Sequence, residues 1–155
     1  MIPDPVAAVC AAFLGAAPEG LVTGLYLRGG VGFGEWAPGQ SDVDFVATLV
    51  HRPSPAEVDG LLAAHEAVSA AYPEVFFDGC HVLTEDLTAD PRTCPDVPVV
   101  LHRAFEQGPV HDAVIAWHEL ARHGVTMHGR DHGGLGVWTS QEVLLGFTRG
   151  NLDTY

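Results

Sequence analysis

Apolar residues along the chain fall into runs typical of strands and stripes typical of helices. Nearly continuous apolar or alternating runs predict strands at 21–27, 43–50, 74–83, 97–105 and 125–128. Longer segments with an apolar face predict helices at 5–14, 54–71 and 112–123. The run at 43–50 has hardly a polar side chain, so we expect a central strand that is covered on both faces. The order of the segments predicts an α/β (α+β) fold, a mixed sheet flanked by helices.

Glycines and helix-start signals divide the chain near its end. Glycines occupy four of the eight positions from 129 to 136, which is typical of a linker. Thr139-Ser-Gln-Glu142 then has the pattern of a capping box at the start of an apolar helix. We therefore predict one domain over 1–136 and, over 137–155, the opening of a truncated helical domain.

The stretch from 25 to 50 carries the clearest chemistry. Gly29 and Gly30 form a turn after the first strand, and a short helix is predicted over 30–35. Asp42 and Asp44 begin the next strand, where alternate side chains point to the same face. Paired carboxylates need a counter-charge, and together with phosphate oxygens they suit Mg²⁺. Because a glycine turn lets backbone N–H groups approach phosphates, the stretch predicts a site for a polyphosphate and a metal ion.

This arrangement resembles the nucleotidyltransferase superfamily, whose signature is Gly-Ser, a short spacer and Asp-x-Asp. The similarity is greatest to the aminoglycoside adenylyltransferases that modify streptomycin and spectinomycin. The segments that carry it are Leu27-Arg-Gly-Gly, Ser41-Asp-Val-Asp-Phe-Val, Asp78-Gly-Cys-His-Val-Leu-Thr-Glu-Asp-Leu87 and Trp117-His-Glu-Leu-Ala-Arg-His-Gly-Val-Thr-Met-His-Gly129. The segments occur in the family's order, and the resemblance extends over most of the chain. The resemblance implies a nucleotidyltransferase fold in which a helical second domain has only begun.

The resemblance also implies roles for three carboxylates. Asp42 and Asp44 would bind Mg²⁺ that bridges to the phosphates of ATP. Asp78 stands where the family has its third carboxylate, which acts as general base or completes the metal site. The implied reaction is transfer of AMP from Mg-ATP to a hydroxyl of a small cationic acceptor such as an aminoglycoside.

The phosphate-binding turn departs from the family pattern at one position. Gly29 and Gly30 would cradle the phosphates, with Ser41 capping the turn beside them. The family usually has serine where this chain has Gly30. A hydroxyl that donates to a charged acceptor is worth roughly 1.5–3 kcal/mol, so its loss predicts weaker nucleotide binding.

Charge and composition narrow the partners. The net charge is −13 with only 7 Lys and Arg, which argues against a nucleic-acid surface and favours a cationic partner, or simply reflects an acidic protein. No apolar run approaches the roughly 20 residues that span a membrane. The start lacks the basic residues of a signal peptide, and the three cysteines have no metal-type spacing. These features favour a cytoplasmic protein with free thiols.

The number of histidines suggests a metal site, but their spacing does not. Five of the nine lie between 111 and 132, but His118 and His123 are five residues apart, whereas one helical face requires four. We therefore expect no metal site there.

Two other functions stay open. One is a catalytically impaired remnant that binds a partner or self-associates through the surface where a second domain would dock. The other is a stand-alone nucleotidyltransferase that modifies a protein.

Overall fold

The computed structural model describes residues 2–37 and 42–153, with side chains as far as residue 149. The elements in chain order are α1 (Asp4–Ala16), β1 (Val22–Arg28), β2 (Val43–Leu49), α2 (Pro55–Ala71), β3 (Phe77–Val82), α3 (Thr84–Leu87), η1 (Pro91–Thr93), β4 (Val97–Leu101), β5 (Ala104–Gly108), α4 (Ala113–His123), β6 (Val125–His128), η2 (His132–Gly134) and α5 (Gln141–Asp153). None of the helices described has the length and apolar character needed to cross a membrane.

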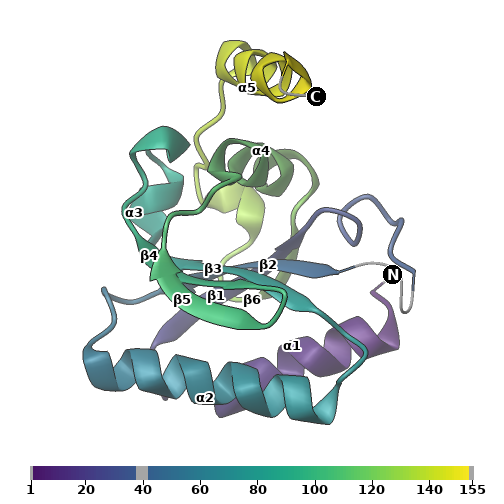
Figure 1. Ribbon diagram of the computed structural model, residues 1–155, viewed down its shortest axis with the longest axis vertical. Coiled ribbons are helices and arrows are strands. Elements are labelled where there is room, and N and C mark those ends of the chain that lie inside the picture. The colour runs from purple at the N-terminus through teal and green to yellow at the C-terminus, as the bar shows by residue number, and fades with distance from the viewer. Residues whose placement is uncertain (1, 38–41, 154–155) are drawn as a thin grey trace.

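The six strands form one mixed sheet in the order β5-β4-β3-β2-β1-β6. Among the described strands only β2 and β3 pair in parallel, and α2 connects them as the crossover. Helices α1 and α2 cover one face of the sheet, whereas α3 and α4 lie over the other (Figure 1). The predicted mixed sheet flanked by helices is confirmed.

Each face of the sheet has its own apolar core. Phe13 of α1 and Leu61 of α2 pack with the side chains that β1 and β2 send to one face. Trp117 of α4 packs with Tyr26 and Val46 on the other face. Strands β1 and β2 supply both cores, which explains their nearly continuous apolar sequence. Burying one such large side chain contributes about 1.5–3 kcal/mol.

One predicted strand is a hairpin in the structure. The segment predicted as a strand at 97–105 is split into β4 and β5 by a two-residue turn, His102-Arg103. Both residues have positive φ, 49° and 68°. Such turns favour Asn-Gly, because the left-handed region costs other residues roughly 1–2 kcal/mol each. The sequence has neither residue here, so the usual signal of a hairpin is missing.

Three further expectations need correction. The predicted helix over 30–35 is a series of turns, because Gly32 and Gly34 weaken a helix and Gly34 has φ of 72°. Strand β3 begins at Phe77, later than expected. The sequence also predicts a solvated turn at Glu85 and Asp86, but this segment forms the short helix α3 and Asp86 is buried. Its carboxylate binds Arg52 through two hydrogen bonds of 2.6 and 2.7 Å.

The last helix lies beyond α4 (Figure 1). Its connection to the domain includes Ser140, whose N–H donates to Nε2 of His118 at 2.9 Å, and Gln141, which accepts from Arg122 at 2.8 Å. The other nitrogen of His118, Nδ1, lies 2.6 Å from the Val114 carbonyl oxygen. His118 thus has a structural role. The boundary at residue 136 stays a prediction.

Candidate functional site

Three neighbouring strands place charged residues side by side. Arg28 of β1 faces Asp44 of β2, and Asp44 in turn faces Asp78 of β3. Residues in register on adjacent strands point to the same face of a sheet. The two aspartates, far apart in sequence, therefore lie together on the face covered by α4.

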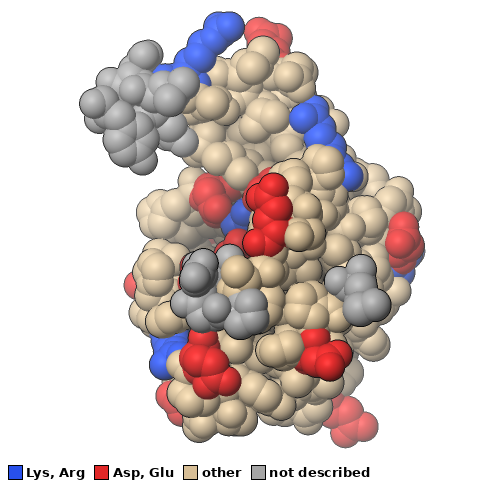
Figure 2. Space-filling model, turned by 90° about the vertical axis from the view of Figure 1, so that its right-hand side faces the viewer, with Lys and Arg blue, Asp and Glu red and all other residues tan. Residues whose placement is uncertain are grey.

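These side chains line a cavity of about 270 Å³. Asp42 joins Arg28, Asp44 and Asp78 in its wall, and the β4–β5 hairpin and the start of α4 close the other side. Acidic side chains gather around a hollow near the middle of the face shown in Figure 2, with basic atoms among them. The structure thus brings together all three carboxylates that the sequence singled out.

Arg28 joins the sheet to α4. Its guanidinium donates to Oε1 of Glu119 at 2.6 Å and to Oδ2 of Asp112 at 2.7 Å, and its side chain is only 12% exposed. Burial lowers the pKa of Arg28, but the carboxylates of Asp112, Asp44 and Glu119 together raise it above the ordinary value. A permanent positive charge is therefore held beside Asp44.

The carboxylates nevertheless repel one another. Burial raises the pKa of Asp44 to about 6, the Arg28 charge opposes this shift, and the charges of Asp42 and Asp78 add to it. Burial also raises the pKa of Asp78, against a smaller lowering by the backbone N–H of His102. The site carries more negative charge than Arg28 neutralises, so a cation would be stabilised there.

Asp78 stands out by its lack of partners. Asp78 is 4% exposed, and neither of its carboxylate oxygens makes a hydrogen bond with a described residue, although the backbone N–H groups of His102 and Arg103 lie near enough to lower its pKa. Leaving a buried polar group unpaired costs about 1–3 kcal/mol, and more for a charge. An unpaired buried carboxylate in a cavity indicates a place for a ligand.

One potential metal-binding group occurs in the described part of the chain. Ligand atoms of Asp42, Asp78 and His102 all lie within 4.8 Å of one another. Asp44 lies in the same cavity but outside this group. The pairing of Asp42 with Asp44 as metal ligands stays a prediction, and the group of close ligand atoms adds His102 to Asp42 and Asp78.

The two glycines of the predicted phosphate turn have different surroundings. Gly29 has φ of 69°, and a Cβ added to it would lie 2.6 Å from Oδ2 of Asp44. Only glycine therefore lets the Asp44 carboxylate approach the turn this closely. At Gly30 the nearest atom to an added Cβ is the backbone nitrogen of Trp36 at 3.9 Å, an ordinary contact. The third predicted member of the phosphate site, Ser41, lies outside the described residues.

Several residues of the cavity had no predicted role. Arg28 belongs to the segment that carries the resemblance, and a charged residue closing an apolar strand beside two aspartates is a signal that could have marked it. Asp112 and Glu119 reach Arg28 only through the packing of α4. His102 could have been found from the polar pair that interrupts the apolar run at 97–105.

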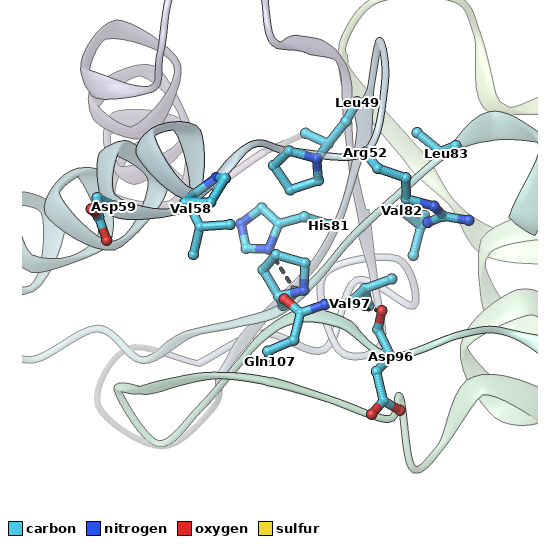
Figure 3. Close-up of a pocket in the computed structure, with 13 residues that line it drawn as sticks. Leu49, Arg52, Val58, Asp59, His81, Val82, Leu83, Asp96, Val97 and Gln107 are labelled. Carbon is cyan, nitrogen blue, oxygen red and sulfur yellow. Dashed lines mark hydrogen bonds between the residues drawn. The ribbon is translucent and has the colours of Figure 1, made fainter.

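A second cavity, of about 370 Å³, lies near the other end of β3 (Figure 3). Its wall is largely apolar, and its Arg52 is held by Asp86. In Figure 3 the side chains of Asp59 and Asp96 lie at opposite ends and do not converge. His81 places Nδ1 at 2.8 Å from the Pro98 carbonyl oxygen and Nε2 at 2.9 Å from Nε2 of His65. Because the groups here are already engaged or far apart, we place the functional site at the carboxylate cavity.

Comparisons with known proteins assign no family. No protein-family model matches the chain, and no curated protein matches it. Among solved structures it is similar to a crystal structure of a toxin-antitoxin with AMP-PNP, with 10% identity and a TM-score of 0.44, over 99% of this chain and 87% of that chain. A similarity this weak carries no argument about activity. The functional interpretation therefore depends on the geometry of the carboxylate cavity.

Proposed function

We propose that the carboxylate cavity binds ATP with a divalent cation and transfers AMP to a hydroxyl of a small cationic acceptor. The observation that carries this proposal is the register of Asp44 beside Asp78, with Asp42 in the same cavity wall. It is the acidic arrangement that the nucleotidyltransferase resemblance implies, formed by strands that are distant in sequence.

The donor set of the cavity fits a divalent cation. The oxygens of Asp78 are buried without a partner in the described part of the chain, and the repulsion among the carboxylates favours a cation between them. A bound cation would neutralise the triphosphate and stabilise the charge of the leaving pyrophosphate. Asp42 and Asp78 would hold it, and Asp44 would contribute a further negative charge. The closeness of Asp78 to Asp42 favours the ligand role over the role of general base.

Arg28 has a positioning role in this proposal. Its ion pairs with Asp112 and Glu119 fix the guanidinium, and the charge keeps the pKa of Asp44 from rising further. With a pKa of about 6, Asp44 takes up a proton in mildly acidic solution, and a bound cation would favour the charged carboxylate.

The charge around the cavity supports a cationic acceptor. Glu106 and Asp112 also line the wall, and the chain as a whole has a net charge of −13. An acidic cavity on an acidic protein concentrates cations. Aminoglycosides, which the resemblance implies, are polycations with several hydroxyls and are the first acceptors to test.

The direct test is product formation. The chain is incubated with ATP, a divalent cation and streptomycin or spectinomycin, and the adenylylated antibiotic is measured by mass spectrometry. We expect product from the wild-type chain and none from an Asp42→Asn/Asp44→Asn variant. Asp59→Asn, which removes a carboxylate at the other cavity, is the matched control and should keep activity. Equal product from the double variant would refute the proposal.

A partner-binding module without catalysis is the second candidate. It is favoured by α5, where Leu145 is 44% exposed, on the segment predicted to open a second domain. Such a helix could bind another protein or a second copy of the chain. Light scattering that shows self-association of the wild type, lost in Leu145→Asp, together with no ATP binding, would favour this function instead.

A further inference from the structure

The turn between β4 and β5 has an unusual sequence for its conformation. Its two residues, His102 and Arg103, both have positive φ. Asn-Gly satisfies such a turn at lower cost, because side chains with an ordinary Cβ are disfavoured in the left-handed region. Backbone strain of this kind is often found at functional sites. The turn lies at the rim of the carboxylate cavity, and His102 lines that cavity.

Neighbouring groups hold the imidazole of His102 in place. Its ring contacts the ring of Phe76 edge to face, with the centroids 6.1 Å apart. The guanidinium of Arg103 lies 4.6 Å from the centroid of the Phe76 ring. His102 itself is exposed and lines the cavity. Its ring is thus oriented from one side and open to solvent on the other.

The ligand atoms around His102 have the spacing of a metal site. One nitrogen of His102 and one oxygen each of Asp42 and Asp78 lie within 4.8 Å of one another. Ligands that bind one ion at about 2.0–2.2 Å can be at most roughly 4 Å apart, so a shift of at most about 1 Å would close the group around an ion. Asp78 also indicates a ligand here, because it is 4% exposed and makes no hydrogen bond in the described part of the chain.

The donor set also selects among ions. Carboxylates alone suit Mg²⁺, whereas an imidazole nitrogen favours late first-row dications such as Co²⁺, Ni²⁺ and Zn²⁺. Three protein ligands with a further position left open are typical of catalytic rather than structural zinc sites. The open position would be available to a phosphate oxygen.

We propose that Asp42, Asp78 and His102 form a site for Zn²⁺ or a similar late first-row dication, which they bind more tightly than Mg²⁺. The site deepens the proposed function, on which its use in AMP transfer rests, by naming the ion and adding a nitrogen ligand. Binding of the ion itself does not depend on any reaction.

Calorimetric titration of the untagged full chain with Zn²⁺ and with Mg²⁺, without nucleotide, tests the site. We expect one Zn²⁺ per chain, bound at least about tenfold more tightly than Mg²⁺. His102→Asn should weaken Zn²⁺ binding by about tenfold to a hundredfold and leave Mg²⁺ binding nearly unchanged. His111→Asn is the matched control, because His111 lines the same cavity but lies outside the group of close ligand atoms.

Asparagine at position 102 keeps the test interpretable, since it tolerates the left-handed region and the variant should fold at least as stably as wild type. Zn²⁺ should raise the Tm of the wild type and of His111→Asn, but much less that of His102→Asn. Wild-type Zn²⁺ affinity in His102→Asn, or an equal loss in His111→Asn, would overturn the proposal.

The outcome separates the metal site from the proposed function. Zn²⁺ binding that requires His102, in a chain that never transfers AMP, would leave the site intact and refute the function. AMP transfer supported by Mg²⁺, with no Zn²⁺ binding through His102, would overturn the site and leave the function.

Discussion

Replacing Gly30 by serine would add a hydroxyl to the turn that follows β1. The structure has room for it: the atom nearest to an added Cβ is the backbone nitrogen of Trp36, at 3.9 Å, and Gly30 is not in the left-handed region. The family that the sequence resembles usually has serine at this position. A hydroxyl that donates to a phosphate oxygen is worth about 1.5–3 kcal/mol. We therefore expect Gly30→Ser to bind ATP about tenfold to a hundredfold more tightly in the presence of a divalent cation.

The neighbouring glycine supplies a matched control. Gly29→Ser adds the same hydroxyl one residue earlier, but φ there is 69° and the new Cβ would lie 2.6 Å from Oδ2 of Asp44. The left-handed conformation costs serine roughly 1–2 kcal/mol, and Asp44 must move away. We expect Gly29→Ser to be less stable and to bind ATP more weakly than wild type.

Calorimetry measures the Kd for ATP in wild type and both variants, and thermal unfolding reports their folding. Gly30→Ser should keep or slightly raise the Tm, because replacing glycine at a compatible position stabilises by about 0.4–1 kcal/mol. An unchanged ATP affinity in a well-folded Gly30→Ser chain would refute the assignment of this turn to the phosphates. An equal gain in Gly29→Ser would refute the geometric argument.

Three further changes test the carboxylate cavity and the core. Asp78→Asn should raise the free energy of unfolding by about 1 kcal/mol, because it removes a buried charge, while abolishing cation-dependent ATP binding; chemical denaturation and calorimetry measure the two effects. Arg28→Gln should lower the free energy of unfolding by about 2–3 kcal/mol, because two charge-assisted hydrogen bonds are lost, and an NMR titration should find the pKa of Asp44 raised further. Burial lowers the pKa of His65 to about 2 and that of His81 to about 4, so below pH 6.5 the unfolded chain binds protons that the folded chain does not. The free energy of unfolding should therefore fall by about 1.4 kcal/mol per pH unit for each histidine as the pH drops from 6.5 towards 4, and denaturation at several pH values measures the slope.

Matched variants separate these effects from general ones. Asp59→Asn is the matched control for Asp78→Asn and should change neither the free energy of unfolding nor ATP binding markedly. For the histidines, His65→Gln should reduce the slope with pH, whereas His128→Gln, at an exposed position, should not. Equal slopes in the two variants would mean that the buried pair does not control acid sensitivity. A stable Arg28→Gln chain would show that the contacts of Arg28 with α4 contribute little.

The parts of the fold that could be predicted are those that each segment specifies locally. Strands β1 and β2 have nearly continuous apolar sequences, which burial on both faces explains. Helix α2 begins after Ser54, whose side chain accepts from the N–H of Glu57 at 3.2 Å, so its start is marked by a local pattern. The hairpin at His102 was missed because its turn lacks the glycine or asparagine that usually marks a positive φ. The sequence alone also gave no means of pairing β2 with β3 in register.

In the carboxylate cavity, too, some features follow from the local sequence and others depend on the fold. Asp42 and Asp44 are separated by one residue, so a common face is expected if both lie in a strand. Asp42 precedes β2, and both side chains line the carboxylate cavity. The nearness of Asp78 to both depends on the parallel register that α2 makes possible, and only the family resemblance indicated it. His102 joins the cavity through the fold of a separate hairpin, which no local pattern near the aspartates could show.

Calorimetric titration of the full chain with ATP, with and without a divalent cation, shows whether the carboxylate cavity is a nucleotide site. Parallel titrations with Mg²⁺ and Zn²⁺ cover both ions, and an Asp42→Asn/Asp44→Asn variant of verified fold is the control. We predict ATP binding that requires the cation and is lost in the double variant. Absence of ATP binding by the well-folded wild type, or equal binding by the double variant, would contradict the claim that these carboxylates form a nucleotide site.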